Sequence, residues 1–419
     1  MTLLNWRILC PFLFAALLPI SANAASWAAL AWILAYLVAS IREKALPTFS
    51  VHHPTFILLV LPVLFWAWHI VGLLYTTDPA TSGWDNVELK ASILLLPLLA
   101  FLLPNVGKSD TSDAAQMPYI YTGFIVGCFS AVVICVGSAF FYLPTDGALS
   151  FFYLRLVRPL DAHPTYLGMY VVFALFATLE LPAHWWLFRG RGWVRGVVAT
   201  IFAVFVVLLV SRGALLAMAI IGVCYALYRG YAAGKLWRGV MNAVVGVAAL
   251  VLILRAVPEF QSRTVRIQTA AQTANAENLN ADSRVQAWHG AIQVIREHPI
   301  WGVGTGDAYT ELVNAYHQQG SAKAEHDHLN AHNQFLQTYV QLGIIGFVLL
   351  LTMLGTAFYR ALRTRNVLFV IFIALFCIIN IFEATFERQA GVLFFSFFLA
   401  LLSTAQHQFS SPSYPQQRA

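Results

Sequence analysis

The sequence predicts an all-α polytopic membrane protein with about 12 transmembrane helices and one large helical loop outside the membrane. Three observations predict this class. Hydrophobic residues make up 59% of the 419 residues and charged residues only 11%, whereas soluble domains are about 45–50% apolar and about 25% charged. Apolar segments recur at lengths close to the roughly 20 residues that a spanning helix needs. The basic residues of the connecting loops favour one side of the membrane, as the positive-inside rule requires.

The apolar segments divide the chain into four predicted parts. Residues 1–255 hold the first nine spans, 256–331 form a large loop that acts as an amphipathic lid, 332–405 hold the last three spans, and 406–419 form a polar tail. The fourth span is short and can be tilted or only partly spanning. The segments lie near residues 8–22, 25–41, 54–75, 91–104, 118–143, 166–188, 194–210, 214–228, 237–255, 334–359, 366–382 and 390–405.

The N-terminus fits two interpretations. Arg7, an apolar run and then Ala22-Asn23-Ala24 follow the order of a cleavable signal peptide. The alternative is a retained first span, which we expect. Both interpretations put Ala25 on the outer side of the membrane.

Basic residues set the orientation. With the N-terminus inside, the inner loops carry Arg42, Lys44, Lys108, Arg189, Arg191, Arg195, Arg229, Lys235, Arg238, Arg360, Arg363 and Arg365, and the opposite loops carry Lys90, Arg155, Arg158, Arg212 and Arg388. We therefore expect a multi-pass protein of the bacterial inner membrane, with the large loop in the periplasm and the tail in the cytoplasm. The net charge of +6 then reflects cytoplasmic loops, and we expect no nucleic acid partner.

The five cysteines support neither a disulfide framework nor a thiolate metal site. None lies in the long polar loop, and no Cys-x-x-Cys pair occurs.

The apolar stretch 196–228 is interrupted only by Ser211-Arg212-Gly213. One helix of that length would run about 50 Å, against a hydrocarbon core of about 30 Å. The chain must therefore turn here, and we expect Gly213 to supply the backbone freedom. Arg212 then lies at the membrane surface, as a lipid-headgroup anchor or as part of an anion site; we favour the anion site.

The polar loop predicts two helices. Asn280, Asp282 and Ser283 can cap the first helix, and His298-Pro299 ends it. Val285, Trp288, Ile292 and Ile295 recur on one face at helical spacing. After a turn at Gly302, Gly304 and Gly306, a second helix runs from Asp307 to about Gln319. We interpret this loop as an amphipathic lid on the outer leaflet.

Arg284 lies in the first turn of the first loop helix. A helix N-terminus favours anions, and an arginine there adds a fork that matches phosphate oxygens. A solvated surface arginine is the alternative for Arg284 taken alone.

Histidines precede the tenth span. His328 and His332 have the spacing of zinc ligands on one helix, but His-x-x-x-His without a glutamate is a weak metal signal. The alternative is a general base. We expect His332 to open the tenth span, where the helix N-terminus disfavours imidazolium and keeps the ring able to accept a proton.

Further polar groups have weaker signals. Asp161, His163 and Tyr166, with Arg158 upstream, form either a helix cap with interface aromatics or a wall of an active site, and Glu383 and Asn333 are similar. The run Gly302–Gly306 follows no strand and lacks a Lys-Ser/Thr pair, which argues against nucleotide binding.

Together these motifs resemble the O-antigen ligase/polymerase (Wzy_C) superfamily. The resemblance rests on Ser-Arg-Gly-Ala at 211–214, Arg-Val-Gln-Ala-Trp at 284–288, His-Pro-Ile-Trp-Gly-Val-Gly-Thr-Gly at 298–306, Ala-His-Asn-Gln-Phe-Leu-Gln at 331–337 and Leu-Gly-Ile-Ile-Gly at 342–346. These motifs cover about residues 196–360, and the twelve-span plan with a late periplasmic loop also looks like that family.

The resemblance implies a GT-C-like membrane glycosyltransferase. It would move an O-antigen glycan from undecaprenyl pyrophosphate to a periplasmic acceptor, which in the ligase branch is lipid A-core. It implies a reaction without metal, nucleotide or other cofactor. Direct in-line displacement at the anomeric carbon would invert the configuration of that carbon. Arg212 and Arg284 would bind the pyrophosphate and His332 would be catalytic, while Asp161, His163 and Glu383 match only loosely. We expect membrane lipids as further partners and a monomeric protein.

Other activities fit parts of the sequence. An O-antigen polymerase or a protein O-oligosaccharyltransferase of the same superfamily would carry similar motifs, because sequence barely separates acceptors. A secondary transporter fits the span count, but predicts repeated halves and ionisable groups near mid-membrane. The polar residues here gather at one surface instead.

Overall fold

The computed structural model describes residues 6–43, 56–102, 113–181, 185, 191–256 and 283–404. The regular elements within these ranges are all helical. Lys44, Lys108, Arg189, Asn280 and Asp282, and the predicted tail 406–419, lie outside the described residues.

All twelve predicted apolar segments coincide with helices of the described chain. The first part contains α1 (Trp6–Leu17), α2 (Ala22–Glu43), α3 (Phe56–Gly72), η1 (Pro79–Gly83), α4 (Trp84–Leu89), α5 (Ala91–Leu102), α6 (Asp113–Asp146), η3 (Gly147–Phe151), α7 (Tyr153–Val157), η4 (Arg158–Leu160), α8 (Pro164–Glu180), α9 (Gly192–Leu208), α10 (Arg212–Ala232) and α11 (Leu236–Ala256). The last part contains α13 (Ser283–Glu297), α14 (Ala308–Gln318), α15 (Ala322–His326), α16 (Gln334–Arg363), α17 (Val367–Asn380), η6 (Thr385–Glu387) and α18 (Gln389–Thr404).

Within the described residues, five helices are long and apolar enough to cross a membrane. The number rises to six if 153–160 and 164–180, which meet at 81°, form one bent span. Five further apolar helices have 10–17 residues. The protein is therefore a helical polytopic membrane protein. The finer expectation of twelve spans depends on how the shorter helices cross the bilayer.

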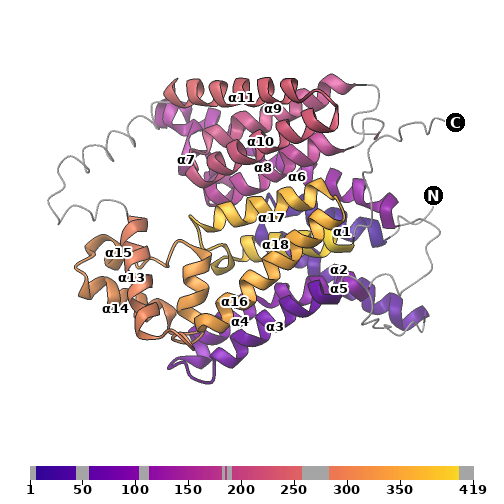
Figure 1. Ribbon diagram of the computed structural model, residues 1–419. Coiled ribbons are helices and arrows are strands. Elements are labelled where there is room, and N and C mark those ends of the chain that lie inside the picture. The colour runs from indigo at the N-terminus through magenta and orange to yellow at the C-terminus, as the bar shows by residue number, and fades with distance from the viewer. Residues whose placement is uncertain are drawn as a thin grey trace.

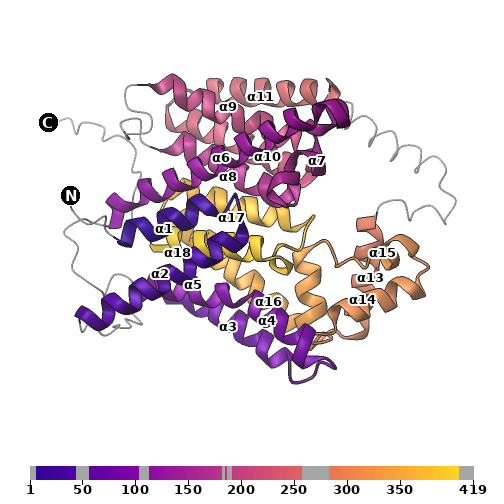
Figure 2. The ribbon, with the colours of Figure 1, turned by 180° about the vertical axis from the view of Figure 1, so that it is seen from behind.

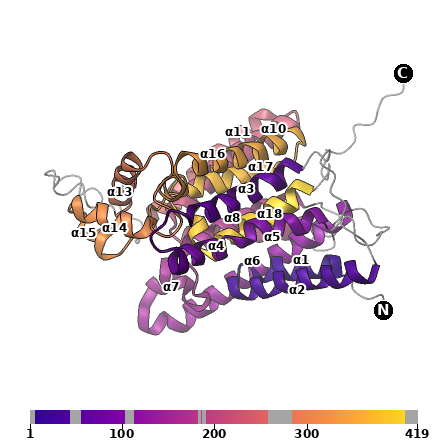
Figure 3. The same cartoon turned by 90° about the horizontal axis from the view of Figure 1, so that it is seen from below.

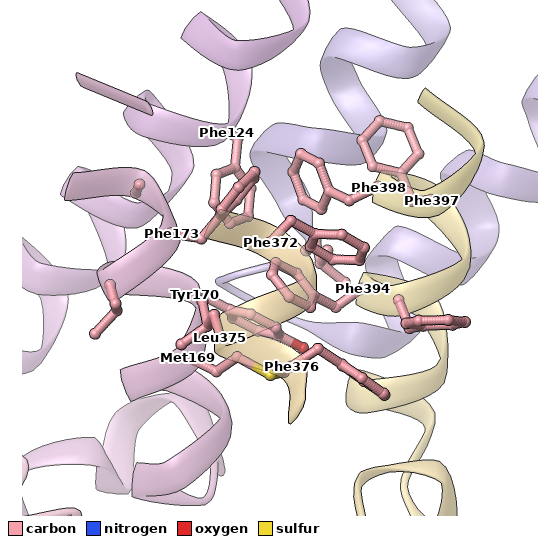
Figure 4. Close-up of a cluster of buried hydrophobic side chains, with 14 of the residues drawn as sticks. Phe124, Met169, Tyr170, Phe173, Phe372, Leu375, Phe376, Phe394, Phe397 and Phe398 are labelled. Atoms are coloured by element: carbon pink, nitrogen blue, oxygen red, sulfur yellow. The ribbon is translucent and has the colours of Figure 1, made fainter. Parts of the chain in front are cut away.

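Aromatic packing fixes the centre of the bundle. Phe173 of α8 is fully buried, with its ring centroid 5.8 Å from that of Phe372 on α17 and 4.6 Å from that of Phe398 on α18. Phe124 of α6 joins them (Figure 4). Aromatic pairs at these separations add to the stability that apolar burial supplies. This cluster seats the α17–α18 hairpin against α8, so the turn between α17 and α18 lies beside the N-terminus of α8.

The chain turns between α9 and α10, as predicted, but a different residue makes the turn. Val210 adopts the left-handed conformation, with φ of 48°. Gly213 is a helical residue of α10, so the expectation that it supplies the freedom is wrong. A Cβ at Gly213 would lie 3.6 Å from both Ile379 and Phe382, which is an ordinary packing distance, so neither the turn nor the packing requires a glycine here.

The helices of the polar loop, α13 to α15, lie together at one end of the bundle (Figures 1, 2 and 3). Their bounds agree with both predicted loop helices. The face of α13 that packs differs from the predicted apolar stripe. Its buried residues are Gln286, Ala287, Gly290, Ala291 and Val294, while Ile292 remains exposed. Small residues pack here because the ring of Tyr316 on α14 lies directly over Gly290.

A kink in α16 anchors the glycine-rich segment at the base of α13–α15. Gly343 has φ of 63° inside α16, which frees carbonyl groups from the helix ladder. Val303 and Gly304 donate their backbone N–H groups to the carbonyls of Val340 and Gln341, at 2.9 and 3.0 Å. The glycines therefore allow the backbone of this segment to lie close to the backbone of α16.

The same segment is also fastened to the end of α3. The hydroxyl of Thr305 donates to the carbonyl of His69 at 2.6 Å. The carboxylate of Asp307 accepts the N–H of Thr77 at 2.7 Å. The base of the predicted lid is thus tied to the bundle at two places.

Candidate active site

Two adjoining cavities lie between the bundle and the base of α13–α15 in the described part of the chain. The smaller, of about 250 Å³, is lined by Tyr153, His163, Thr165, Val210, Ser211, Arg212, Ser283, Arg284, His332 and Glu383. The larger, of about 670 Å³, shares His163, His332 and Glu383 with it and extends toward α4 and η6. The predicted residues Arg212, Arg284 and His332, which are distant in sequence, therefore meet at one cavity.

Helix N-termini surround the smaller cavity. Among the described elements that line it, α8 begins after His163, α10 begins after Ser211 and α13 starts at Ser283. The helix α16 begins two residues after His332, which also lines the cavity. Each N-terminus carries backbone N–H groups without intrahelical partners and the positive end of the helix dipole. Arg212 is the first residue of α10 and Arg284 the second of α13. His163 and Asn333 already cap the starts of α8 and α16, whereas no side chain caps α10. The two arginines and the start of α10 give the cavity features that favour an anion.

His332 lies just outside α16. The helix begins at Gln334, and Asn333 caps it by accepting the N–H groups of Phe335 and Leu336. The expectation that His332 opens the helix is therefore wrong by two residues. Its φ of 43° and the hydrogen bond from its N–H to the Asn330 side chain, at 2.9 Å, turn the imidazole toward both cavities.

Glu383 pairs with His332. The Nδ1 atom of His332 lies 3.2 Å from Oε1 of Glu383, whose side chain is almost fully buried. Burial raises the pKa of Glu383, but the hydrogen bond from His332 and the charges of His332, His163 and Arg284 outweigh it and hold the pKa below its ordinary value. The carboxylate on Nδ1 also holds the His332 ring in one orientation.

Polar residues of α16 hold both members of this pair. The side-chain oxygen of Gln337 accepts the N–H of Ala331 at 3.0 Å, which fixes the segment before His332. The side-chain oxygen of Gln334 accepts the N–H of Phe386 at 2.7 Å, which fixes the turn after Glu383. The glutamines of the motif Ala-His-Asn-Gln-Phe-Leu-Gln thus position the segments that carry His332 and Glu383. The sequence analysis did not anticipate this role, although glutamines that recur on one face of an apolar helix were a usable signal.

His163 is the third titratable group shared by the two cavities. Its Nδ1 accepts the N–H of Thr165 at 3.3 Å and caps α8. Burial lowers the pKa of His163, and this effect exceeds the opposite influence of Glu383. The ring is therefore neutral at neutral pH, with its proton on Nε2.

The remaining candidate residues lie at different distances from this centre. Tyr166 lines the larger cavity. Asp161 is exposed, and Arg158 bonds Asp146 at 3.0 Å; neither lines either cavity. Tyr153 and Arg388 line the cavities and were not singled out.

His328 does not share a helix face with His332. It follows the end of α15 with φ of 46°, and its exposed ring stacks on Tyr309 at 6.0 Å. The zinc-like spacing of the two histidines is therefore not realised on a helix. No group of three or more His, Cys, Asp or Glu side chains with the geometry to hold a metal occurs among the described residues.

The fold and the site define a helical polytopic membrane protein with an arginine-lined cavity beside a histidine–glutamate pair. Residues 196–351 match the Wzy_C family, described as O-Antigen ligase. The chain therefore carries an O-antigen ligase family domain over this segment, which includes Arg212, Arg284 and His332 but ends before Glu383.

One curated relative is an uncharacterized protein of Haemophilus influenzae. It is 29% identical over 93 residues, which cover 22% of this chain and 23% of the relative. The similarity thus spans less than a quarter of either protein.

Proposed function

We propose that the protein transfers an O-antigen glycan en bloc from undecaprenyl pyrophosphate to lipid A-core, as an O-antigen ligase. The observation that supports it most is the arrangement at the smaller cavity. Arg212, Arg284 and several helix N-termini surround the same space that His332 and Glu383 face. A lipid-linked pyrophosphate donor and a hydroxyl acceptor need this combination of an anion site and a base.

In the proposed reaction, a hydroxyl oxygen of the acceptor attacks the anomeric carbon of the glycan. The bond from that carbon to the pyrophosphate oxygen breaks, and the anomeric configuration inverts. The acceptor proton moves to Nε2 of His332, whose Nδ1 proton remains hydrogen-bonded to Glu383. Undecaprenyl pyrophosphate leaves with both electrons of the broken bond.

The departing pyrophosphate gains negative charge, and the two arginines would stabilise that charge. A guanidinium presents two parallel N–H donors to phosphate oxygens, and preorganised donors stabilise charge as it develops in the transition state. Arg212 and Arg284 would supply this stabilisation in the proposed mechanism, so the reaction needs neither a metal ion nor a nucleotide.

The proposal places the protein in the bacterial inner membrane, in a GT-C-like twelve-span arrangement with the site facing the periplasm. The end of α16 next to the site begins after His332, whereas its other end carries Arg360 and Arg363. Cytoplasmic loops are rich in such basic residues, which supports this orientation.

Lipopolysaccharide profiling of a strain that lacks the protein tests the proposed acceptor. Loss of long chains from lipid A-core, with lipid-linked polymer accumulating, is the result expected for a ligase. Lipid A-core capped by single repeats would instead identify a polymerase. Normal lipopolysaccharide with an unglycosylated pilin would identify a protein O-oligosaccharyltransferase and overturn the proposed acceptor.

A further inference from the structure

A fully buried lysine contacts two residues that line the larger cavity, Asn86 and Glu387. Lys90 has no exposed surface and occupies the junction between α4 and α5. Its Nζ lies 2.9 Å from the side-chain oxygen of Asn86 and 3.1 Å from Oε1 of Glu387. A buried ammonium group is costly unless it is paired and hydrogen-bonded. The proposed mechanism gives this lysine no role.

Glu387 connects Lys90 to the turn that carries Glu383. It is the last residue of η6, four residues after Glu383. Its second oxygen, Oε2, accepts a hydrogen bond from the side chain of Gln341 at 3.2 Å. Glu387 is therefore held from one side by the α4–α5 junction and from the other by α16.

The helix α16 also follows directly on the segment that carries His332, the partner of Glu383. Gln341 lies on the α16 segment that follows His332, and its carbonyl accepts the N–H of Gly304. The ion pair of Lys90 and Glu387 thus closes a connection from α4 through η6 to α16. Such buried pairs contribute little net stability, because desolvation offsets the attraction. What they can fix is the relative placement of the elements that they join.

We propose that Lys90 is a positioning residue for the transfer reaction. By holding Glu387, it fixes the turn 383–388 so that the Glu383 carboxylate stays against Nδ1 of His332. The reactive side chains come from two segments of the chain, and the Lys90 network sets their relative placement. This inference rests on the proposed function for its kinetic consequences, but its geometric consequence stands independently.

The kinetic test is a double-mutant cycle with purified protein, lipid-linked glycan donor and lipid A-core. Lys90→Met should lower kcat about 10- to 100-fold, the effect of roughly a 1 Å misplacement. The KM for the donor should change little, because Arg212 and Arg284 are untouched. In a Glu383→Gln background, Lys90→Met should add less than about a twofold loss, because coupled residues are not additive. An equal loss in both backgrounds overturns the proposal.

A matched control separates positioning from general damage. Arg229 pairs with the buried carboxylate of Glu180 at 3.4 Å, away from both cavities. Arg229→Met should leave kcat within about twofold of wild type. Lys90→Arg, which keeps the charge, should recover part of the activity that Lys90→Met loses. If Lys90→Met does not insert, Glu387→Gln carries the test, since it removes the charge with little change of shape. A Glu387→Gln protein with full kcat also overturns the proposal.

A second measurement does not depend on glycan transfer. His332→Cys and Glu383→Cys are introduced together into a chain without its natural cysteines, and the rate of disulfide formation is followed. Adding Lys90→Met should slow this rate several-fold, whereas Arg229→Met should not. An unchanged rate overturns the positioning role even if transfer is confirmed. If Lys90→Met slows the disulfide rate but the wild-type protein transfers no glycan, the proposed function is refuted and the positioning role is retained.

Discussion

The Nδ1 atom of His332 lies 3.2 Å from Oε1 of Glu383, although the two residues are 51 positions apart in the chain. A carboxylate that binds one ring nitrogen fixes the tautomer and directs the other nitrogen toward substrate. Because His332 faces both cavities, its Nε2 is available to a hydroxyl group there. The first two predictions follow from this relationship.

Replacing His332 tests the assignment of the general base. His332→Ala should reduce the rate by roughly 10²–10⁴, the usual contribution of a positioned acid–base group. Donor binding should remain, because the arginines hold the pyrophosphate. His328→Ala should be mild, since His328 is exposed and stacks on Tyr309. Purified protein should also be indifferent to EDTA; activity lost on chelation and restored by zinc or magnesium would make the histidines metal ligands instead.

Glu383→Gln should lower kcat by roughly 10² or more, on the scale set by loss of the carboxylate in serine protease triads. The pKa of Glu383 is below its ordinary value. The carboxylate is therefore ionised at any pH above the ordinary pKa and becomes protonated only as the pH falls through the lowered pKa. The defect should therefore persist across about pH 5.5 to 8 in a rate–pH profile. A defect that vanishes at the acid end of this range would show that the carboxylate is not the group responsible.

The arginine pair should act through geometry as well as charge. Arg212→Ala and Arg284→Ala should each nearly abolish transfer and weaken donor binding while the protein remains folded and inserted. Lysine should rescue poorly at either position, because an ammonium keeps the charge but loses the two-pronged fork. Arg158→Ala serves as the control, since Arg158 pairs with Asp146 outside the cavities. Full activity of Arg212→Lys would reduce Arg212 to an electrostatic anchor.

Impermeant thiol labelling of spheroplasts tests the orientation. Gln319→Cys, at the exposed end of α14, should be labelled, and Arg363→Cys, at the opposite end of α16, should not. The exposed natural Cys224 is replaced in both chains. Labelling at 363 without labelling at 319 would invert the membrane assignment.

The sequence predicted the helices well because hydrophobic length and helical spacing are local properties. It also singled out Arg212, Arg284 and His332, which line one cavity in the structure, since each stands in a recognisable motif. It could not predict the partner of His332, because the turn of Glu383 is placed by aromatic packing of α8, α17 and α18 far along the chain.

Predictions about local backbone were less accurate. Gly213 was the obvious residue for the turn before α10, yet Val210 adopts the left-handed conformation and Gly213 lies within the helix. The apolar stripe of α13 was also a misleading guide. Its small-residue face packs instead, because Tyr316 requires a residue without a side chain at Gly290.

Gly343 gives the last prediction. Its φ of 63° lies in the left-handed region, and a Cβ there would overlap the carbonyl oxygen of Ile300. Gly343→Ala should therefore cost at least about 2 kcal/mol, from backbone strain and the displaced Ile300–Trp301 segment. The matched control is Gly355→Ala on the same helix, where no heavy atom lies within 4 Å of the new Cβ.

The two variants should separate clearly in a detergent melting experiment. Gly355→Ala should melt at or slightly above the wild-type temperature, because alanine favours a helix over glycine by roughly 1 kcal/mol. Gly343→Ala should melt lower and lose transfer activity, because the kink presents the carbonyls that bind Val303 and Gly304 and so anchors the base of α13–α15 beside Arg284 and His332. Equal melting temperatures for the two variants would mean that α16 tolerates a side chain at its kink, and that the glycine-rich segment is held by its bonds to the end of α3 alone.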